Sequence, residues 1–190
     1  MSKLSEAKIL GGIGAILMLF GGFILPGLGA IIGLVLVFIA VKYIASETKD
    51  ESIFDNYLMY FICSIIAIVA VVVIFFYSIG FSLTFFTALE SMEFTDFSSV
   101  WDFFSQYLLA WIIAAVVGWI FIIISALYLR KCYDSIAKRT NVHLFKTTGL
   151  VYLIGVVTLI IGIGIVIMLI AKIIEIVAYF SLPEKLPGKK

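Results

Sequence analysis

Charge is the property that this sequence has least of. Only 13% of its 190 residues are charged and 64% are hydrophobic, whereas a soluble domain carries about 25% charged residues. The net charge is +1, and no cluster of bases alternates with surface aromatic residues, which argues against nucleic acid as a partner. The composition therefore indicates an integral membrane protein whose first partner is the lipid bilayer.

Cysteine and histidine are also scarce. The chain has two cysteines, Cys63 and Cys132, and one histidine, His143. These are too few for a metal site, and neither a GxSxG nor an HExxH motif occurs. We therefore expect no catalytic residues, no metal and no cofactor, and we predict that the protein is not an enzyme.

Long uncharged runs fill most of the chain. The first extends from Ile9 to Ala45 with Lys42 as its only charge. A single helix of that length would measure about 55 Å, against a hydrocarbon core of about 30 Å. Pro26-Gly27 interrupts the run, because proline disfavours helix at the residue before it and glycine permits a turn. This pattern predicts an N-terminal helical hairpin.

The remaining runs complete the predicted fold, an all-α, polytopic transmembrane helix bundle that forms a single integral membrane domain over residues 1–190. An amphipathic helix is predicted in the membrane interface, because aromatic residues recur there at three- and four-residue steps. The predicted spans are 9–25, 28–44, 56–80, 107–129 and 149–171, the interfacial segment is 91–106, and a basic tail occupies 183–190. Five spans are predicted, with six as the alternative.

The distribution of lysine and arginine predicts the orientation. The N-terminus has Lys3 and Lys8, the connection after the second span has Lys42 and Lys49, and the connection 130–146 is rich in bases, whereas 90–102 holds four acids and no base. We therefore expect a multi-pass protein of the cell membrane with a cytoplasmic N-terminus. Five spans place the basic tail outside, against the rule. A break near Gly162-Ile163-Gly164 would instead make the last run return, as a re-entrant segment or a sixth span.

Small residues recur at helical spacing within the predicted spans. This pattern is typical of helices whose backbones pack closely. The predicted packing residues are Gly11, Gly14, Gly22, Gly29, Gly33, Ala110, Ala114 and Gly118. Short segments interrupted by glycine or proline are also typical of broken helices around a transport site. A small transporter or channel with a midplane site is therefore the alternative function.

Ionisable residues near the ends of the spans are the remaining candidates for a site. Lys172 and Glu175 are three residues apart and can form an ion pair on one helical face. The simpler interpretation is a helix-end pair that neutralises itself near a membrane face. The bases of the second polar connection can contact anionic lipid headgroups, although they also serve to fix the topology. These candidates are Arg130, Lys131, Lys138 and Arg139.

Three stretches are familiar as a set: SEAKILGGIGAILMLFGGFI, GLVLVFIAVKYIASETKDESIFDNYL and the closing AYFSLP. The chain is similar to a mainly archaeal family of small multi-spanning membrane proteins, domain of unknown function 996. The resemblance implies a multi-pass fold and a membrane location, and it carries over no catalytic residues. We predict an uncharacterised, non-enzymatic membrane protein that packs or assembles through glycine and alanine faces, as a homo-oligomer or with another membrane protein.

Overall fold

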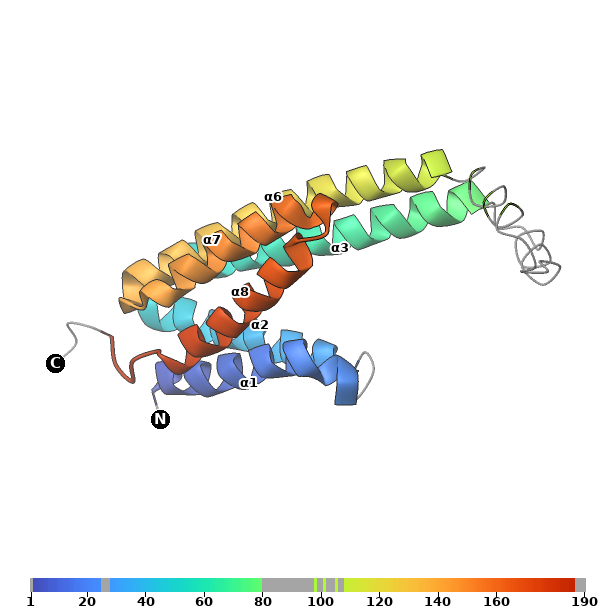
Figure 1. Cartoon of the computed structure of the whole chain (residues 1–190). Coiled ribbons are helices and arrows are strands. Elements are labelled where there is room, and N and C mark those ends of the chain that lie inside the picture. The colour runs from blue at the N-terminus through green and yellow to red at the C-terminus, as the bar shows by residue number, and fades with distance from the viewer. Residues whose placement is uncertain are drawn as a thin grey trace. The chain divides into compact units, whose positions relative to one another are not determined.

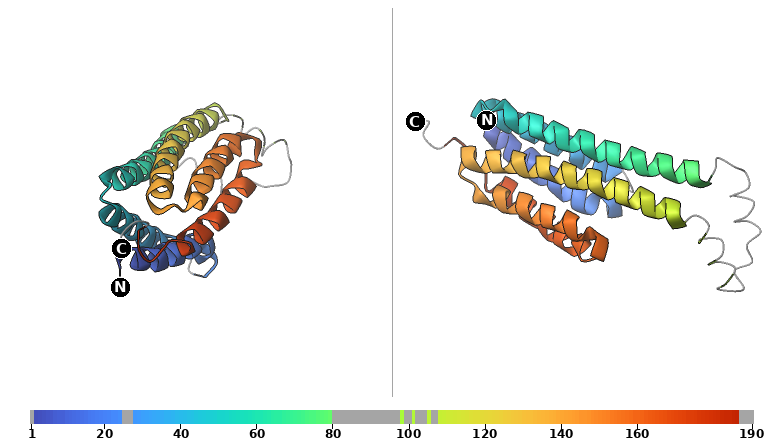
Figure 2. Two further views of the ribbon diagram at one scale, coloured as in Figure 1. Left: turned by 90° about the vertical axis from the view of Figure 1, so that its left-hand side faces the viewer. Right: turned by 90° about the horizontal axis from the view of Figure 1, so that it is seen from above.

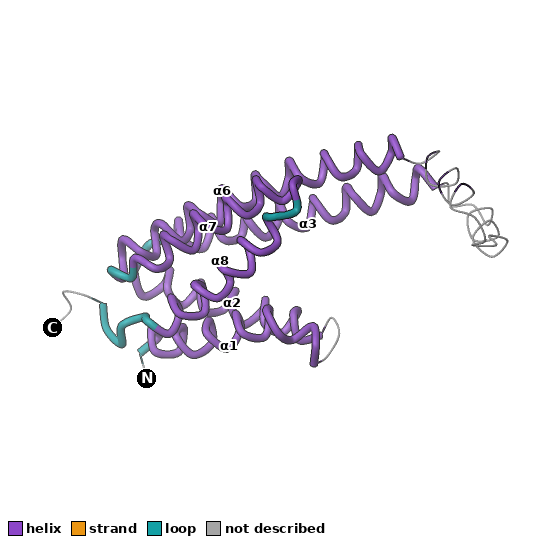
Figure 3. Tube along the Cα trace, viewed as in Figure 1, coloured by secondary structure: helices purple, strands orange, loops and turns teal. Residues whose placement is uncertain are grey.

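The structure is a computed structural model that describes residues 2–24, 28–79, 98, 101, 105 and 108–186. Helices make up almost all of these ranges, and no strand occurs within them (Figure 3). The elements are α1 (Lys3–Ile24), α2 (Leu28–Thr48), α3 (Glu51–Ile79), α6 (Leu108–Thr140), α7 (His143–Val157), the 3₁₀ helix η1 (Thr158–Ile161) and α8 (Gly164–Phe180) (Figure 1). The all-α prediction is confirmed. The predicted turn at Pro26-Gly27 and nearly all of the interfacial segment 91–106 lie outside the described residues.

The chain forms two compact units. The first contains residues 1–62 and 123–190, and the second contains residues 63–122. In the first unit, α1 packs on α2, α7 packs on α8, and α1 also packs on α8. The hairpin of α1 and α2 and the hairpin of α7 and α8 each appear as a pair of neighbouring helices in Figure 2.

Within the described residues, five helical segments are long and apolar enough to cross a membrane. They are Lys3–Gly21, Leu28–Thr48, Glu51–Ile74, Trp111–Thr140 and His143–Ile161. Many of their large apolar side chains are exposed, such as Ile31, Ile68 and Ile112. Such a surface suits lipid, whereas in water it would be a large unpartnered apolar patch. The five segments agree with the predicted number of spans and indicate a membrane-embedded protein.

The last apolar run is divided, so the single helix predicted over 149–171 is wrong. Helix α7 ends at Val157, η1 continues to Ile161, and α8 begins at Gly164. Gly162 makes the turn with a φ of 82°, in the left-handed region where a Cβ meets the following carbonyl oxygen. The alternative prediction, a break near Gly162-Ile163-Gly164, is therefore the one that the structure shows. Helix α8 is only about 25 Å long at 1.5 Å per residue.

Gly162 offers a test of this turn. Gly162→Ala should lower the free energy of unfolding by about 1 kcal/mol, because alanine is strained at positive φ. No other atom lies within 4 Å of the added Cβ, so packing contributes nothing to this loss. Unfolding in mixed detergent micelles, followed by circular dichroism, measures the change. Gly162→Asn is the control and should lose less, because asparagine tolerates the left-handed region. Equal stability of Gly162→Ala and the wild type would contradict the turn.

Hydrogen bonds bring both ends of the chain to one end of the first unit. Ser2 Oγ donates to the carbonyl of Glu184 over 2.5 Å, and Lys3 Nζ donates to Ser46 Oγ over 2.9 Å. The described part of the tail therefore lies beside the N-terminus (Figure 1). This end of the first unit, where Ser2, Lys3, Ser46 and Glu184 lie, is called the polar end. The placement of the tail opposite the N-terminus, which five spans implied, is wrong because the turn at Gly162 reverses the chain.

The core of the first unit lies toward the polar end. Aromatic rings connect three helices there: the Phe145 ring centroid is 5.6 Å from that of Tyr133 and 5.1 Å from that of Tyr179. The largest fully buried side chains are Leu4, Val37, Val41, Ile44, Ile53, Tyr57, Tyr133, Ile136, Phe145, Glu175, Tyr179 and Leu182. All but one of these are apolar or aromatic. The exception, Glu175, marks the candidate site.

Candidate functional site

Glu175 is a carboxylate within the helical core. The buried face of α8 consists of Gly164, Ala171, Glu175, Ala178 and Tyr179, and the last four recur at the three- and four-residue steps of one helical face. Ala171 and Ala178 are both buried, so the residue between them also faces inward. Glu175 is only 1% exposed. It lies about 8 Å from the end of α8, counted as five residues of helical rise.

Lys172 and Glu175 form an ion pair. Lys172 Nζ lies 2.8 Å from Glu175 Oε2, and the lysine side chain is 18% exposed. Glu175 Oε1 has no hydrogen-bond partner among the described residues. Removing a charge from water costs several kcal/mol unless its remaining hydrogen-bonding capacity is satisfied. The pair is thus only partly compensated.

Tyrosines from four helices surround this carboxylate. Tyr57 and Tyr60 come from α3, Tyr133 from α6, Tyr152 from α7 and Tyr179 from α8, and all lie within electrostatic range of Glu175. The ring centroids of Tyr60 and Tyr152 are 6.5 Å apart. The core near Glu175 therefore contains several hydroxyl groups.

A groove of about 390 Å³ opens beside the ion pair. Lys172 Nζ lies 4.0 Å from Met18 Sδ on the groove wall. The residues that line it are Met18, Leu19, Tyr60, Tyr152, Leu159, Ile165, Met168, Leu169 and Lys172. Only Tyr60, Tyr152 and Lys172 among these have polar side chains. An apolar groove with a few converging polar groups is typical of a small-molecule site.

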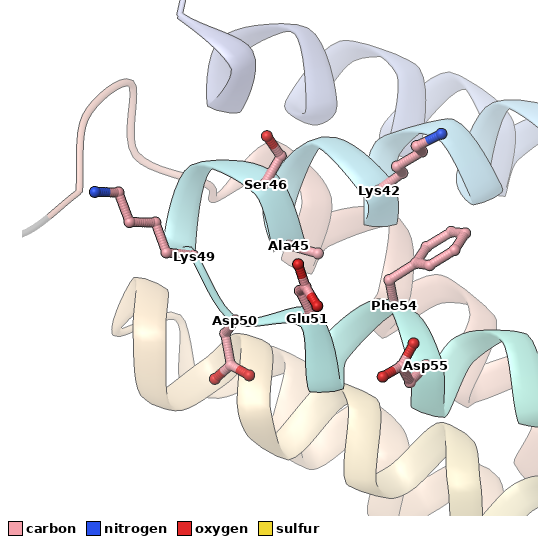
Figure 4. Close-up of a pocket in the computed structure, with 8 residues that line it drawn as sticks. All are labelled: Lys42, Ala45, Ser46, Lys49, Asp50, Glu51, Phe54 and Asp55. Atoms are coloured by element: carbon pink, nitrogen blue, oxygen red, sulfur yellow. The ribbon is translucent and has the colours of Figure 1, made fainter.

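A larger hollow of about 760 Å³ lies at the corner between α2 and α3. It is lined by Lys42, Ala45, Ser46, Lys49, Asp50, Glu51, Phe54 and Asp55 (Figure 4). The ammonium groups of Lys42 and Lys49 point away from the carboxylates, and Asp50 points away from Asp55 (Figure 4). Lys42 Nζ lies 6.0 Å from the Phe54 ring centroid. Because its charges are of both signs and diverge, this hollow is a weaker candidate than the groove at Lys172.

An ion pair between Asp50 and Arg139 connects this corner to the end of α6. Ser52 Oγ donates to Asp50 Oδ1 over 2.6 Å, and Arg139 Nε donates to Asp50 Oδ2 over 2.8 Å. The hydrogen bond from Ser52 and then that from Arg139 lower the pKa of Asp50 below its ordinary value, while burial opposes them. The carboxylate is therefore charged in the folded protein at neutral pH.

Asp50→Asn should lower the free energy of unfolding by up to about 1 kcal/mol at pH 7, as expected for a partly exposed ion pair. Because the pKa is lower in the folded chain, this stabilisation is present above the pKa of the unfolded chain, about 3.9. It is lost as the pH falls through the folded value. Unfolding measured between pH 7 and pH 3 should thus show the two proteins converging. The exposed Asp55→Asn should stay within about 0.5 kcal/mol of wild type throughout, and a constant difference for Asp50→Asn would contradict the pairing.

The four predicted lipid-contacting bases do not form one cluster. Lys138 Nζ pairs with Asp134 Oδ2 over 2.6 Å, and Arg139 is engaged by Asp50. Arg130 and Lys131 instead line a hollow between α6 and α7. The two pairs of bases therefore have different environments.

Glycines bring the backbones of α1 and α2 into contact. A Cβ on Gly14 would lie 2.7 Å from the carbonyl oxygen of Gly33, and one on Gly33 would lie 2.6 Å from that of Gly14. A second crossing joins Gly29 to Gly21. Gly21 is the immediate neighbour of the predicted Gly22, whose surroundings lie outside the described part. Because Gly21 and Gly22 are adjacent, the sequence alone does not show which of the two faces the partner helix.

The other predicted small residues lie at different contacts. Gly11 packs against the ring of Tyr179, and a Cβ on Gly118 would lie 2.5 Å from Val71 Cγ2. Ala114 is buried, and the surroundings of Ala110 are not described. Close approach also occurs at Gly12, Gly149, Gly155 and Gly164, none of which is among the predicted packing residues. Gly155 and Gly164 matter most for the site, because they bring α7 against α8.

No group of three or more His, Cys, Asp or Glu residues that could hold a metal ion occurs within the described ranges. Cys63 and Cys132 are both buried free cysteines.

These features define an all-helical, membrane-embedded protein with an ion pair in its core. The chain belongs to the family described as Protein of unknown function (DUF996), which matches residues 29–173. It is also similar to an uncharacterized protein of the archaeon Methanocaldococcus jannaschii, MJ1644. The two are 34% identical over 187 residues, which cover 98% of this chain and 97% of that protein. No solved structure matches the chain. The predicted family resemblance is confirmed.

Proposed function

We propose that this protein is a non-enzymatic transporter that binds a small solute in the groove beside the Lys172–Glu175 ion pair. The observation that carries the proposal is the fully buried Glu175, whose Oε1 has no hydrogen-bond partner in the described part of the chain. An ionisable side chain inside a membrane costs at least about 2.5 kcal/mol, so it is retained where it serves an ion or substrate pathway.

The broken last run supports this proposal. Transporters commonly build their sites from short, interrupted helices, which expose polar groups at membrane depth. Here the turn at Gly162 and the contact between Gly155 and Gly164 make a short hairpin of α7 and α8. Both helices of that hairpin contribute side chains to the groove.

The arrangement indicates which solute would bind. The Lys172 ammonium lines the groove and Glu175 lies behind it, so a solute with an anionic or accepting group would take over a hydrogen bond of Lys172. The empty pair is neutral, and a bound anion would leave one net negative charge in a medium of low dielectric constant. The free Oε1 of Glu175 is where a compensating proton or small cation would bind. Transport would therefore couple an anionic solute to a cation.

The glycine faces pack helices of the same chain against one another, so they serve the protomer's own fold. The glycine contacts described above, at Gly14, Gly33, Gly21 and Gly29, are all within one chain. Assembly with a second copy or another membrane protein would need a different surface. We also propose a location in the cell membrane with both ends of the chain cytoplasmic, which satisfies the positive-inside rule for the tail.

Uptake by proteoliposomes tests the transport proposal. A panel of labelled small anions, amino acids and monovalent cations should include at least one solute that the wild-type protein carries. Glu175→Gln and Lys172→Met should each reduce that flux at least tenfold, whereas Glu51→Gln, an exposed acid at the polar end, should leave it unchanged. A solute present at 100 times its Kd should also stabilise the protein by about 2.7 kcal/mol. Flat flux and no stabilisation across the panel would refute the proposal.

A further inference from the structure

We infer that the hollow between α6 and α7 binds the headgroup of an anionic phospholipid. This hollow has a volume of about 370 Å³ and lies at the polar end, separate from the groove at Lys172. Its lining residues are Leu127, Arg130, Lys131, Asp134, Lys146 and Leu150. Three of the six are bases, and two are leucines.

The helical register sorts these side chains by depth. Leu127 is three residues before Arg130, and Leu150 is four residues after Lys146, so each leucine shares a helical face with a base. Helices α6 and α7 are connected at Asn141, at the polar end, so both leucines lie one turn closer to the membrane centre. Both are more than 40% exposed. The hollow therefore changes from basic to apolar along the direction in which a phospholipid lies.

Gly149 holds the two walls together. A Cβ at this position would lie 3.0 Å from the Cα of Arg130, so α7 lies directly against the backbone of α6. This contact places Lys146 and Arg130 on opposite walls of one hollow. A phosphate between them would accept two parallel N–H hydrogen bonds from the arginine, a geometry that the planar guanidinium favours.

The charge of the hollow favours an anion. Its single acid, Asp134, is already paired with Lys138 over 2.6 Å. The bases Arg130, Lys131 and Lys146 therefore outnumber the available negative charge, and basic pockets between helices on the cytoplasmic side bind anionic headgroups. Each base near an anionic membrane surface contributes roughly fivefold in affinity. A free anion would use only the basic half of the hollow, so the exposed leucines single out a lipid.

Native mass spectrometry of the full chain in neutral detergent tests this site. Phosphatidylglycerol should bind in one tight copy, at least tenfold more tightly than phosphatidylcholine. The triple variant Arg130→Gln, Lys131→Gln, Lys146→Gln should lose at least tenfold of that affinity, and Lys146→Gln alone about fivefold. A control triple of Lys8→Gln, Lys42→Gln, Lys185→Gln removes the same charge elsewhere and should change binding less than twofold.

Competition distinguishes a lipid site from a site for a free anion. Inorganic phosphate at 10 mM should leave the bound phosphatidylglycerol in place, because it lacks the acyl chains that contact Leu127 and Leu150. Displacement by inorganic phosphate would overturn the inference, as would an equal loss of affinity in the control triple. Should the triple variant fail to fold, the single Lys146→Gln decides, and an unchanged affinity there would also overturn it.

Discussion

Glu175→Ala should lower the free energy of unfolding by about 3 kcal/mol, because it leaves the Lys172 ammonium in the core without its counter-charge. Lys172 is 18% exposed and can turn toward the groove, which keeps the loss at the lower end of the range for broken buried pairs. Equilibrium unfolding in mixed micelles measures the change. A loss below about 1 kcal/mol would show that the pair is effectively solvated.

The double variant Lys172→Met, Glu175→Leu is the matched control. Replacing a buried ion pair by apolar residues of similar volume is often neutral or stabilising. The double variant should therefore unfold within about 1 kcal/mol of the wild type, although Glu175→Ala alone is costly. A double variant as unstable as the single one would mean that the loss arises from packing around Glu175 and not from charge.

Gly33→Leu should be the other severe substitution, with a loss of about 3 kcal/mol or more. A Cβ at Gly33 would lie 2.6 Å from the carbonyl oxygen of Gly14 and 2.7 Å from the backbone nitrogen of Met18. Both are backbone atoms of α1, so relief requires the two helices to separate. Gly33→Ala should lose about 1–3 kcal/mol for the same reason.

Val35→Leu is the control for this pair of helices. Val35 is on α2 and exposed, so a larger side chain there extends into lipid or detergent and should change stability by less than about 0.5 kcal/mol. Unfolding of the three variants under one set of conditions gives the comparison. Similar stability of Gly33→Leu and Val35→Leu would contradict the close crossing of α1 and α2.

The sequence was sufficient for the helical class and for the number of long apolar segments, but not for the division of the last run or for the faces of the helices. In lipid a helix can be apolar on every side, so the pattern that reveals the buried face of a soluble helix is weak. The crossing of Gly14 with Gly33 could be predicted from spacing, whereas the choice between Gly21 and Gly22 could not. The break at Gly162 depends on a positive φ, which glycine permits but does not require.

The buried position of Glu175 could have been found from its neighbours. Gly164, Ala171 and Ala178 repeat every seven residues, and this spacing marks one face of α8. Glu175 lies four residues after Ala171 and three before Ala178, so it shares that face. The spacing of Lys172 and Glu175 predicts that they pair, but it does not show by itself which way the pair points. The groove itself depends on α1, α3 and α7 converging on α8, and no local pattern encodes that convergence.

The placement of the tail illustrates the same limit. Counting five spans placed the bases of the tail outside, and the hydrogen bond from Ser2 to Glu184 now places the two ends together. The count of long apolar runs missed the return of the chain because α8 has only 17 residues, at the lower limit for a span.

Solute uptake by the double variant Lys172→Met, Glu175→Leu tests the transport proposal most directly, because this variant should fold and resist unfolding like the wild type. Reconstituted at the same density, it should carry none of the solute that the wild-type protein accumulates. Uptake by this variant at the wild-type rate would contradict the account, because the ion pair would then be dispensable for transport.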